Sequence, residues 1–280
     1  MAGLSDREAR QVEEANASER TPVVFVHGLW LLPSSWERWA QLFEDAGYAA
    51  VTASWPDDPE TVSEARSHPE VFAGKTVGQV ASHVAELIGR LDSKPAVVGH
   101  SFGGLHAQIA AGRGLTAAAV AIDPAPFRGV LRLPLTTLRA GLPIIANPFN
   151  RDRAVSLNFE QYRYAWANAL SEEAGRQLYE TFHVPGAAAP LFQAAMANLN
   201  PWTELKVNRT NADRGPLLII SGEKDRTVPW ALANASFKKQ RRNPGVTEIV
   251  EIPDRGHALT IDSGWREVAD KALAFVQRFA

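Results

Sequence analysis

The segment from Gly99 to Gly104 reads Gly-His-Ser-Phe-Gly-Gly and constrains the fold of this chain more than any other. It follows a short apolar run, residues 95–98, that is typical of a buried strand, and it precedes an apolar pattern typical of a helix. A G-x-S-x-G pattern in this context predicts a sharp turn, because glycine at Gly99 and Gly103 leaves room where side chains would collide. Such a turn exposes the Ser101 hydroxyl at the start of a helix, whose N–H groups favour developing negative charge. We therefore interpret Ser101 as a nucleophile.

A serine hydroxyl needs a general base near neutral pH, and the chain has seven histidines. His257 is the favoured candidate because it lies in a loop just after the β-rich run 247–252. His100 is adjacent to the serine but is expected to point away from it, into the fold. His27, at the end of the first apolar run, is treated below. The remaining histidines lack a catalytic sequence context: His68, His83, His106 and His183.

The base needs a carboxylate that orients it. Asp225 follows the buried run 216–222 at the carboxyl end of a predicted strand, where open α/β sheets gather their functional groups. Asp123 competes with it, because it also ends an apolar strand. Glu223 is a lesser alternative, since its position at the strand end directs its side chain elsewhere. The sequence favours Asp225 and leaves Asp123 as the alternative acid.

From about residue 21 to its end, the chain resembles α/β-hydrolase-fold proteins of the capped serine esterase and lipase type. That family places its triad in the order serine, acid, histidine, which Ser101, Asp225 and His257 match. Some relatives place the acid after the earlier strand, as Asp123 would be. The resemblance implies a mostly parallel sheet with a cap over the nucleophile.

The resemblance also implies an oxyanion hole made of two backbone N–H groups. One belongs to Leu29, after the His-Gly pair that ends the first apolar strand, and the other to Phe102, directly after the nucleophile. Gly28 permits the close approach of the backbone, and His27 is expected to brace the loop. The stretch from Gly28 to Trp36 is similar to that of the branch holding plant methyl esterases and hydroxynitrile lyases.

Short apolar runs alternate with helical patterns along the chain, which predicts an α/β fold with a mostly parallel sheet covered by helices on both faces. The polar segment 1–20 lacks the hairpin that opens the resembled fold. We expect a frayed helix or tail there and a sheet trimmed at that edge. The predicted strands lie near 23–27, 49–55, 95–100, 117–123, 216–222 and 247–252.

About ninety residues separate the strands that end near Asp123 and begin near Pro216, far more than one crossover helix needs. We therefore expect a helical cap at 128–208, inserted between a first core part, 1–127, and a second, 209–280. The cap is rich in aromatic residues and bent by several prolines. Most of these aromatics should pack the cap itself, and some should face the serine. Trp30, beside the oxyanion hole, is predicted as a wall of the substrate pocket.

Composition narrows the possible functions. The chain has no cysteine, which excludes disulfides, thiolate metal sites and thiol nucleophiles. A formal net charge of −2 and the lack of a basic, aromatic tract give no sign of nucleic-acid binding. No apolar run is long enough for a membrane span, and the N-terminus lacks a signal-peptide layout, so we expect a cytoplasmic protein.

These features predict a serine hydrolase that cleaves a small-molecule ester or lactone with an apolar or aromatic moiety, with no metal or organic cofactor. Alternatives on the same fold are a hydroxynitrile lyase, a carbon–carbon hydrolase, a perhydrolase, cofactor-free oxygen chemistry and a ligand-binding receptor. A lyase would require a cation near the serine, for which Lys224 is the local candidate. The sequence leaves the substrate, the oligomeric state and the mobility of the cap open.

Overall fold

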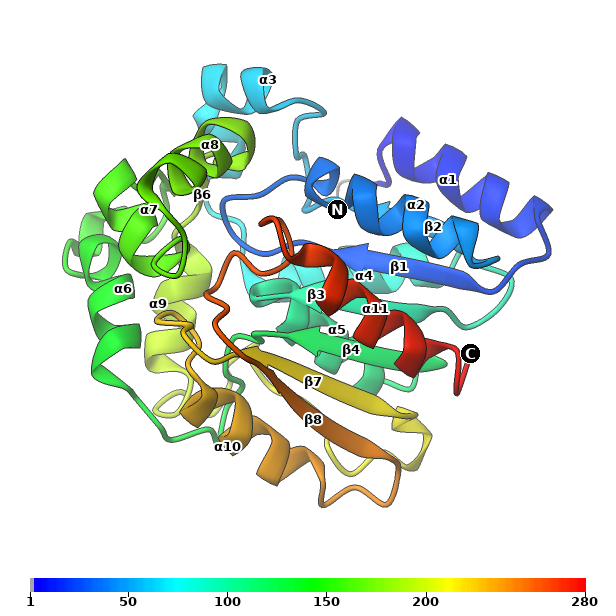
Figure 1. The fold of residues 1–280 in the computed structure, drawn as a ribbon. Helices are drawn as coiled ribbons and strands as arrows, with labels where there is room; N and C mark the ends of the chain where they lie inside the picture. Colours follow the sequence, from blue (N-terminus) through cyan, green and yellow to red (C-terminus); the bar gives the residue numbers. More distant parts are fainter. Residues whose placement is uncertain (1–2) are drawn as a thin grey trace.

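A single six-stranded sheet organises the computed structural model, which describes residues 3–280. Its order is β2-β1-β3-β4-β7-β8, and every neighbouring pair is parallel (Figure 1). The strands lie within two residues of the predicted runs, so the predicted fold class is confirmed. They are β1 (Pro22–Val26), β2 (Ala49–Ala53), β3 (Ala96–His100), β4 (Ala118–Ile122), β7 (Leu217–Gly222) and β8 (Thr247–Ile252).

Helices cover both faces of the sheet. Successive strand residues point to opposite sides, and both sides carry apolar residues that must be buried. In β1, Val23 and Phe25 pack with one set of helices, whereas Val24 and Val26 pack with the other. The first set comprises α2 (Glu37–Asp45) and α11 (Trp265–Val276). The second comprises α4 (Val77–Ile88), α5 (Phe102–Gly112) and α10 (Trp230–Gln240).

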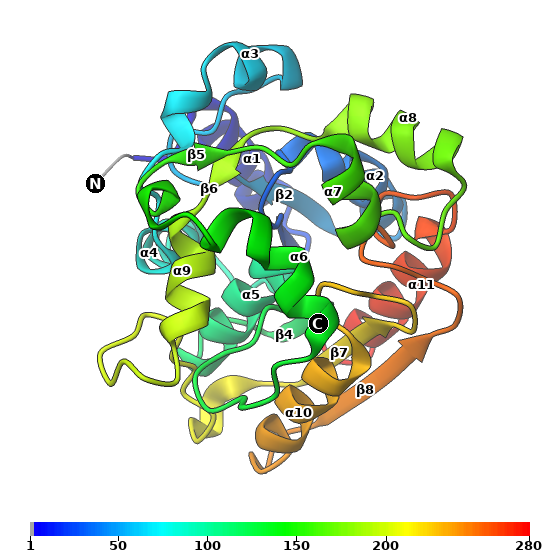
Figure 2. The same ribbon diagram turned by 90° about the vertical axis from the view of Figure 1, so that its left-hand side faces the viewer.

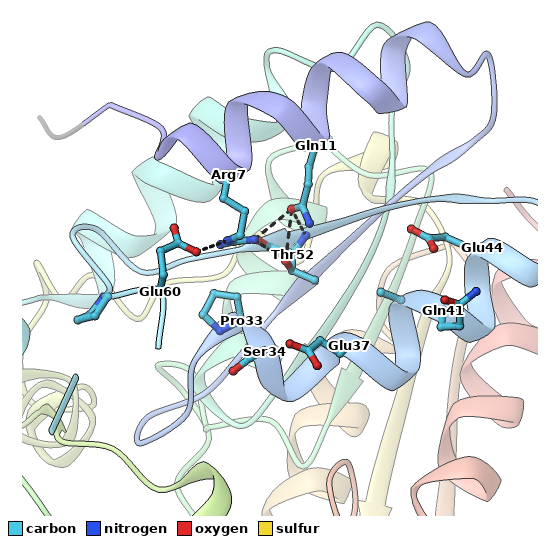
Figure 3. Close-up of a pocket in the computed structure, with 11 residues that line it drawn as sticks. Arg7, Gln11, Pro33, Ser34, Glu37, Gln41, Glu44, Thr52 and Glu60 are labelled. Atoms are coloured by element: carbon cyan, nitrogen blue, oxygen red, sulfur yellow. Dashed lines mark hydrogen bonds and ion pairs between the residues drawn. The ribbon is translucent and has the colours of Figure 1, made fainter. Parts of the chain in front are cut away.

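Helix α1 (Asp6–Ala17) covers the outer side of β2, one of the two edge strands of the sheet (Figure 3). Its side chains bond the outward backbone of β2: Arg7 donates to the Thr52 carbonyl at 2.7 Å, and Gln11 accepts from the Thr52 N–H at 3.0 Å. Glu8 accepts the Ser54 N–H at 2.9 Å, just beyond the strand. These bonds satisfy polar groups that an edge strand leaves free for aggregation.

The expectation of a frayed helix or tail at 1–20 is therefore wrong for the described part, while residues 1–2 lie outside the described residues. A capping box fixes the start of α1, since Ser5 and Glu8 bond each other's backbone N–H groups. Glu8 is fully buried and also contacts His83 Nε2 at 2.9 Å. The predicted trimming of the sheet at this edge agrees with β2 being its outer strand.

The long connection between β4 and β7 gathers beyond one end of the sheet, and in Figure 2 it faces the viewer. It contains helices and also a short antiparallel pair, which the sequence did not predict. We call residues 128–208 the cap, and these boundaries stay a prediction. Its elements are α6 (Leu135–Ile145), β5 (Ala154–Val155), α7 (Phe159–Ala165), α8 (Glu172–Phe182), β6 (Gly186–Ala187) and α9 (Ala189–Met196).

The cap is fastened to the core by a segment between β2 and α4 that holds α3 (Val62–Ser67). Arg66 of α3 donates to the carbonyls of Tyr179, Glu180 and His183 at 2.8–3.1 Å. These oxygens lie at the carboxyl end of α8, where a cation is favoured by the helix dipole. Four short 3₁₀ turns complete the fold: Pro33–Trp36, Pro69–Phe72, Pro148–Asn150 and Ala212–Arg214. Within the described range, every helix is too short or too polar to cross a lipid bilayer.

Candidate active site

Ser101 lies in the turn between β3 and α5 with a positive φ of 56° and a ψ of −118°. This strained conformation is typical of functional turns. The turn is possible because Gly103 has no side chain: a Cβ there would lie 1.9 Å from the Val26 carbonyl oxygen. The predicted strand–turn–helix context of Ser101 is thus present, and the start of α5 is held close against the end of β1.

The structure brings the three residues of the predicted triad together. His257 Nε2 lies 3.1 Å from Ser101 Oγ, and His257 Nδ1 lies 2.6 Å from Asp225 Oδ2. The other oxygen of Asp225 accepts the N–H groups of Thr227 at 2.6 Å and Val228 at 2.9 Å. All three side chains are buried, so each hydrogen bond is shielded from water. The carboxylate is therefore fixed before it orients the imidazole.

Asp123, the alternative acid, lies beside this network but outside hydrogen-bond reach of the histidine. Its Oδ2 is 4.0 Å from His257 Nδ1, and its Oδ1 accepts the Gly222 N–H at 2.8 Å. Complete burial, together with the negative charge of Asp225, raises the pKa of Asp123 well above its ordinary value. Two carboxyl groups thus share the site: Asp225 bonds the histidine, and Asp123 is favoured as a neutral acid. Glu223 points elsewhere, as predicted, and accepts the Asp254 N–H at 2.8 Å.

His100 is fully buried in the fold, as expected, and it lies beside the histidine of the predicted triad. Its ring lies 4.7 Å from that of His257, centroid to centroid, and 5.4 Å from that of Trp166. Neither of its nitrogens has a hydrogen-bond partner among the described residues. Burial lowers the pKa of His100 well below its ordinary value, and the neighbouring His257 adds to this effect. His100 is accordingly a neutral packing partner of the histidine in the triad.

One group of side chains in residues 3–280 could offer three metal-ligand atoms, which lie within 4.8 Å of one another: His100, Asp123 and His257. However, Ser101 and Asp225 already engage both nitrogens of His257. The arrangement therefore fits a hydrogen-bonded triad better than a metal centre.

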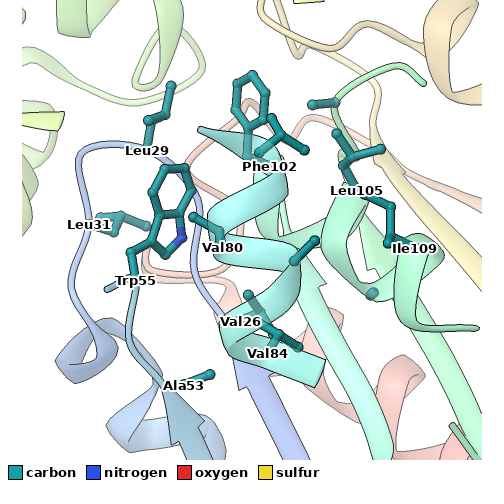
Figure 4. Close-up of a cluster of buried hydrophobic side chains, with 14 of the residues drawn as sticks. Val26, Leu29, Leu31, Ala53, Trp55, Val80, Val84, Phe102, Leu105 and Ile109 are labelled. Atoms are coloured by element: carbon teal, nitrogen blue, oxygen red, sulfur yellow. The ribbon is translucent and has the colours of Figure 1, made fainter. Parts of the chain in front are cut away.

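The two predicted donors of an oxyanion hole, Leu29 and Phe102, flank Ser101 in space. A Cβ at Gly28 would lie 2.8 Å from Ser101 Cβ, so the backbone leading into Leu29 runs directly against the serine. Within the described chain, neither backbone N–H has a hydrogen-bond acceptor. The side chains of Leu29 and Phe102 belong to a buried cluster that includes Trp55 (Figure 4). Both N–H groups thus lack an acceptor among the described residues, and their role as an oxyanion hole stays a prediction.

His27 and Trp30 support the loop around Leu29. His27 Nε2 contacts Asp58 Oδ2 at 3.0 Å, and its Nδ1 contacts the Gly28 carbonyl at 2.8 Å, which agrees with the expected bracing role. Trp30 has a positive φ of 65°, and its Nε1 donates to the Val155 carbonyl of β5 at 3.1 Å. Trp30 therefore connects the loop to the cap, and its part in a substrate pocket stays a prediction.

The sequence analysis did not single out Trp166 as a neighbour of the triad. This residue follows α7 in the cap, is buried, and meets the His257 ring edge-on at a centroid distance of 4.7 Å. Its carbonyl accepts the Ala258 N–H at 3.1 Å. The ring of Tyr162 stacks on Trp166 at 5.8 Å, so cap aromatics form a layer behind the histidine. Only the abundance of aromatics in 128–208 hinted at this contact.

Lys224, the candidate cation for a lyase, is half-exposed and forms an ion pair with Asp254. The hydrogen bond and the charge of Asp254 raise the pKa of Lys224. Its ammonium group is thus engaged at the surface of the loop, away from the hydrogen bonds of the triad.

A parallel sheet with this strand order, a strained serine turn and a cap between β4 and β7 defines an α/β-hydrolase type of fold. Residues 23–271 match the model of the alpha/beta hydrolase family, and the chain belongs to this family. A sequence comparison with curated proteins gives no match.

Solved structures share the fold at low sequence identity. Monoacylglycerol lipase from Paleococcus ferrophilus is 20% identical, with a TM-score of 0.61 over 91% of this chain and 93% of that one. An extracellular α/β-hydrolase from a Paenibacillus species, described as homologous to tobacco salicylic acid binding protein 2, is 17% identical, with a TM-score of 0.64 over 91% and 98%. Polyneuridine aldehyde esterase is 18% identical, with a TM-score of 0.63 over 92% and 99%.

Proposed function

We propose that the protein is a serine hydrolase that cleaves carboxylic esters or lactones through an acyl-enzyme intermediate. One observation carries the proposal: the strained Ser101 lies 3.1 Å from His257, which Asp225 holds at 2.6 Å from the other side. Nucleophile, base and orienting acid then form one continuous hydrogen-bonded chain. The esterase and lipase neighbours favour ester bonds over other substrates of this family.

In the first step, Ser101 Oγ attacks the carbonyl carbon and passes its proton to His257 Nε2. The oxyanion that forms is bound by the N–H groups of Leu29 and Phe102. Collapse of this intermediate breaks the bond to the leaving group, which takes the proton from His257. Water then attacks the acyl-enzyme and loses a proton to His257. Collapse of the second intermediate releases the acid, and His257 returns the proton to Ser101 Oγ. Asp225 stabilises the imidazolium in both halves.

The surroundings of the serine favour an apolar or aromatic substrate. Ser101, His257 and Trp30 are all less than a tenth exposed, and the aromatic Trp166 covers the histidine from the cap. A buried site bordered by aromatic rings favours substrates with an apolar or aromatic group beside the carbonyl. Trp30, which joins the oxyanion loop to the cap, would contact the part of the substrate nearest the carbonyl.

Labelling with a fluorophosphonate tests the proposal directly. We expect stoichiometric modification of Ser101, located by peptide mass spectrometry, and no modification of the Ser101→Ala variant. The exposed Ser63 supplies a matched control, since Ser63→Ala should label like the unaltered protein. Modification of another serine would contradict the assignment of Ser101 as the nucleophile. Absence of any modification, when the cap leaves Ser101 accessible to the reagent, would also contradict it.

A panel of esters and lactones graded by acyl size then defines the reaction. Ser101→Ala and His257→Ala should each lower kcat by several orders of magnitude while leaving the fold intact. An acid and an alcohol as products support hydrolysis, whereas an aldehyde with cyanide from a cyanohydrin would indicate a lyase. Retention of activity within about tenfold in either variant would exclude the proposed triad.

A further inference from the structure

Large hydrophobic side chains that lie open to solvent are concentrated in the cap. Nine of the ten such side chains in the described residues fall between 131 and 202, and the tenth is Val246. The exposed fraction reaches 82% for Leu135 and 83% for Trp202. Apolar patches of this kind are uncommon on monomeric proteins and mark interaction surfaces. The nine are Leu131, Leu133, Leu135, Leu138, Leu142, Phe149, Met196, Leu199 and Trp202.

Helix α6 turns an apolar stripe toward solvent. Leu135, Leu138 and Leu142 follow the three- and four-residue spacing of one helix face, and all three are exposed. The buried residues of the helix are the smaller set, Ala140 and Ile144. Figure 2 shows α6 in front of the remaining cap helices and the sheet. The helix is therefore amphipathic in a way that its packing on the core does not explain.

The exposed residues of the two cap segments belong to one surface. Asn198 accepts the Gly129 N–H at 2.7 Å and donates to the Val130 carbonyl at 2.9 Å. Arg128 donates to the Pro201 carbonyl at 3.2 Å. These bonds place Leu131 and Leu133 beside the segment that carries Leu199 and Trp202, and α6 packs against α9. We call the nine exposed side chains and the arginines named next the outer face of the cap.

The segment 128–153 gives this face an excess of positive charge, although Glu160 lies near Leu142 and Glu204 near Trp202. Residues 128–153 contain five arginines and a single acidic residue, Asp152, in a chain whose formal net charge is −2. All five are exposed, and none forms an ion pair with another described residue. Arg132 lies between two of the exposed leucines, and Arg139 follows Leu138. The arginines are Arg128, Arg132, Arg139, Arg151 and Arg153.

We propose that the outer face of the cap docks on the surface of anionic lipids. Exposed leucines and a tryptophan can enter the boundary between headgroups and acyl chains, while arginines contact the headgroups. A second copy of the chain fits less well, because a two-fold contact would set the arginines of one copy, which form no ion pairs among the described residues, against those of the other. The docking is independent of the chemistry at Ser101, so it goes beyond the proposed function. It would bring the cap, and the site beneath it, to lipid-borne esters.

Binding to vesicles tests the proposal without turnover. The Ser101→Ala protein should cosediment with phosphatidylcholine vesicles that contain phosphatidylglycerol, and much less with phosphatidylcholine alone. Replacing Leu135, Leu138 and Leu142 by Asn should weaken binding at least about tenfold, because three apolar groups no longer leave water. Arg132→Gln with Arg139→Gln should weaken it about fivefold per arginine, and added salt should remove that difference.

Matched controls lie far from the cap. Arg10→Gln with Arg20→Gln removes two exposed arginines near α1, and Val246→Asn removes the one large exposed hydrophobic side chain that the described residues place outside the cap. Both control variants should bind like the parent protein. Equal losses in control and cap variants would overturn the proposal, as would failure of the parent to bind at low salt. Concentration-dependent dimers that the leucine variant abolishes would assign the face to a second copy instead.

A second measurement remains if the leucine variant fails to fold. Trp202 is 83% exposed, so lipids with brominated acyl chains should quench its fluorescence when the parent protein docks. The quenching should disappear in Trp202→Phe. Binding with no quenching that depends on Trp202 would show that another surface docks, and the proposal would be wrong.

Discussion

The strand ends around Ser101 and the outer face of the cap differ in how tightly their residues are packed. At the strand ends, backbone approaches so closely that a single Cβ at Gly103 would collide with the Val26 carbonyl. On the cap, α6 carries its larger apolar side chains toward solvent and accommodates Gly141, which has no heavy atom within 4 Å of an added Cβ. Substitutions should therefore be costly in the first region and tolerated in the second. We therefore expect substitutions at the strand ends to change stability and catalysis, and substitutions on the outer face of the cap to change binding to other molecules.

The strongest test of the first region exchanges its two carboxyl groups one at a time. Asp225→Asn should lower kcat by about three orders of magnitude, because an amide cannot stabilise the imidazolium of His257. Asp123→Asn should stay within about tenfold of the parent, since the raised pKa of Asp123 favours a neutral acid that an amide resembles. Steady-state kinetics on one cleaved ester, with circular dichroism of both variants, measures the contrast. The reverse order would make Asp123 the orienting acid, and equal losses would contradict the assignment of this role to Asp225 alone.

A pair of identical substitutions compares the two regions directly. Gly103→Ala should lower the free energy of unfolding by at least about 3 kcal/mol, because the new Cβ meets backbone that cannot move. Gly141→Ala should raise it by about 0.5–1 kcal/mol, because alanine favours the helix and nothing lies in its way.

Urea unfolding of both glycine variants provides the measurement, and activity supplies a second readout. Gly141→Ala should retain the kcat of the parent. A stability loss in Gly141→Ala comparable to that in Gly103→Ala would remove the distinction between a rigid core and a tolerant cap.

The same distinction explains which features the sequence could predict. Short apolar runs and the glycine turn are local signals. The runs predicted the six strands and the loops after them that carry Asp225 and His257, and the glycine turn predicted the position of Ser101. The approach of Trp166 and His100 to His257 depends on long-range packing, which no local pattern encodes.

Two helices show how tertiary context altered the local expectation. The segment 1–20 reads as polar because α1 buries only Val12 and Ala15 in the apolar core and bonds the edge of β2 through Arg7 and Gln11. The prolines near 143 predicted bends, yet α6 continues through Pro143 and ends two residues later. A proline so close to the end of a helix disturbs few backbone bonds.

Acid should loosen the cap through His183, whose Nε2 accepts the Leu157 N–H at 3.2 Å. Burial, with the nearby charge of Arg66, lowers the pKa of His183 to about 4. The unfolded chain binds a proton near pH 6.5 and the folded chain does not. Stability from this residue is therefore complete above pH 6.5 and is lost as the pH falls toward 4.

At pH 5 the loss from His183 should be about 2 kcal/mol relative to pH 7. His183→Gln keeps an acceptor for Leu157 but cannot titrate, so the difference in unfolding free energy between pH 7 and pH 5 should shrink by that amount. Urea unfolding at both pH values measures it, and His68→Gln, at an exposed histidine, should leave the difference unchanged. His106, whose pKa burial lowers to about 3, contributes equally to every variant and cancels. If His183→Gln keeps the full difference in unfolding free energy between pH 7 and pH 5, groups other than His183 cause the acid sensitivity. The prediction that acid destabilises the cap through His183 would then be wrong.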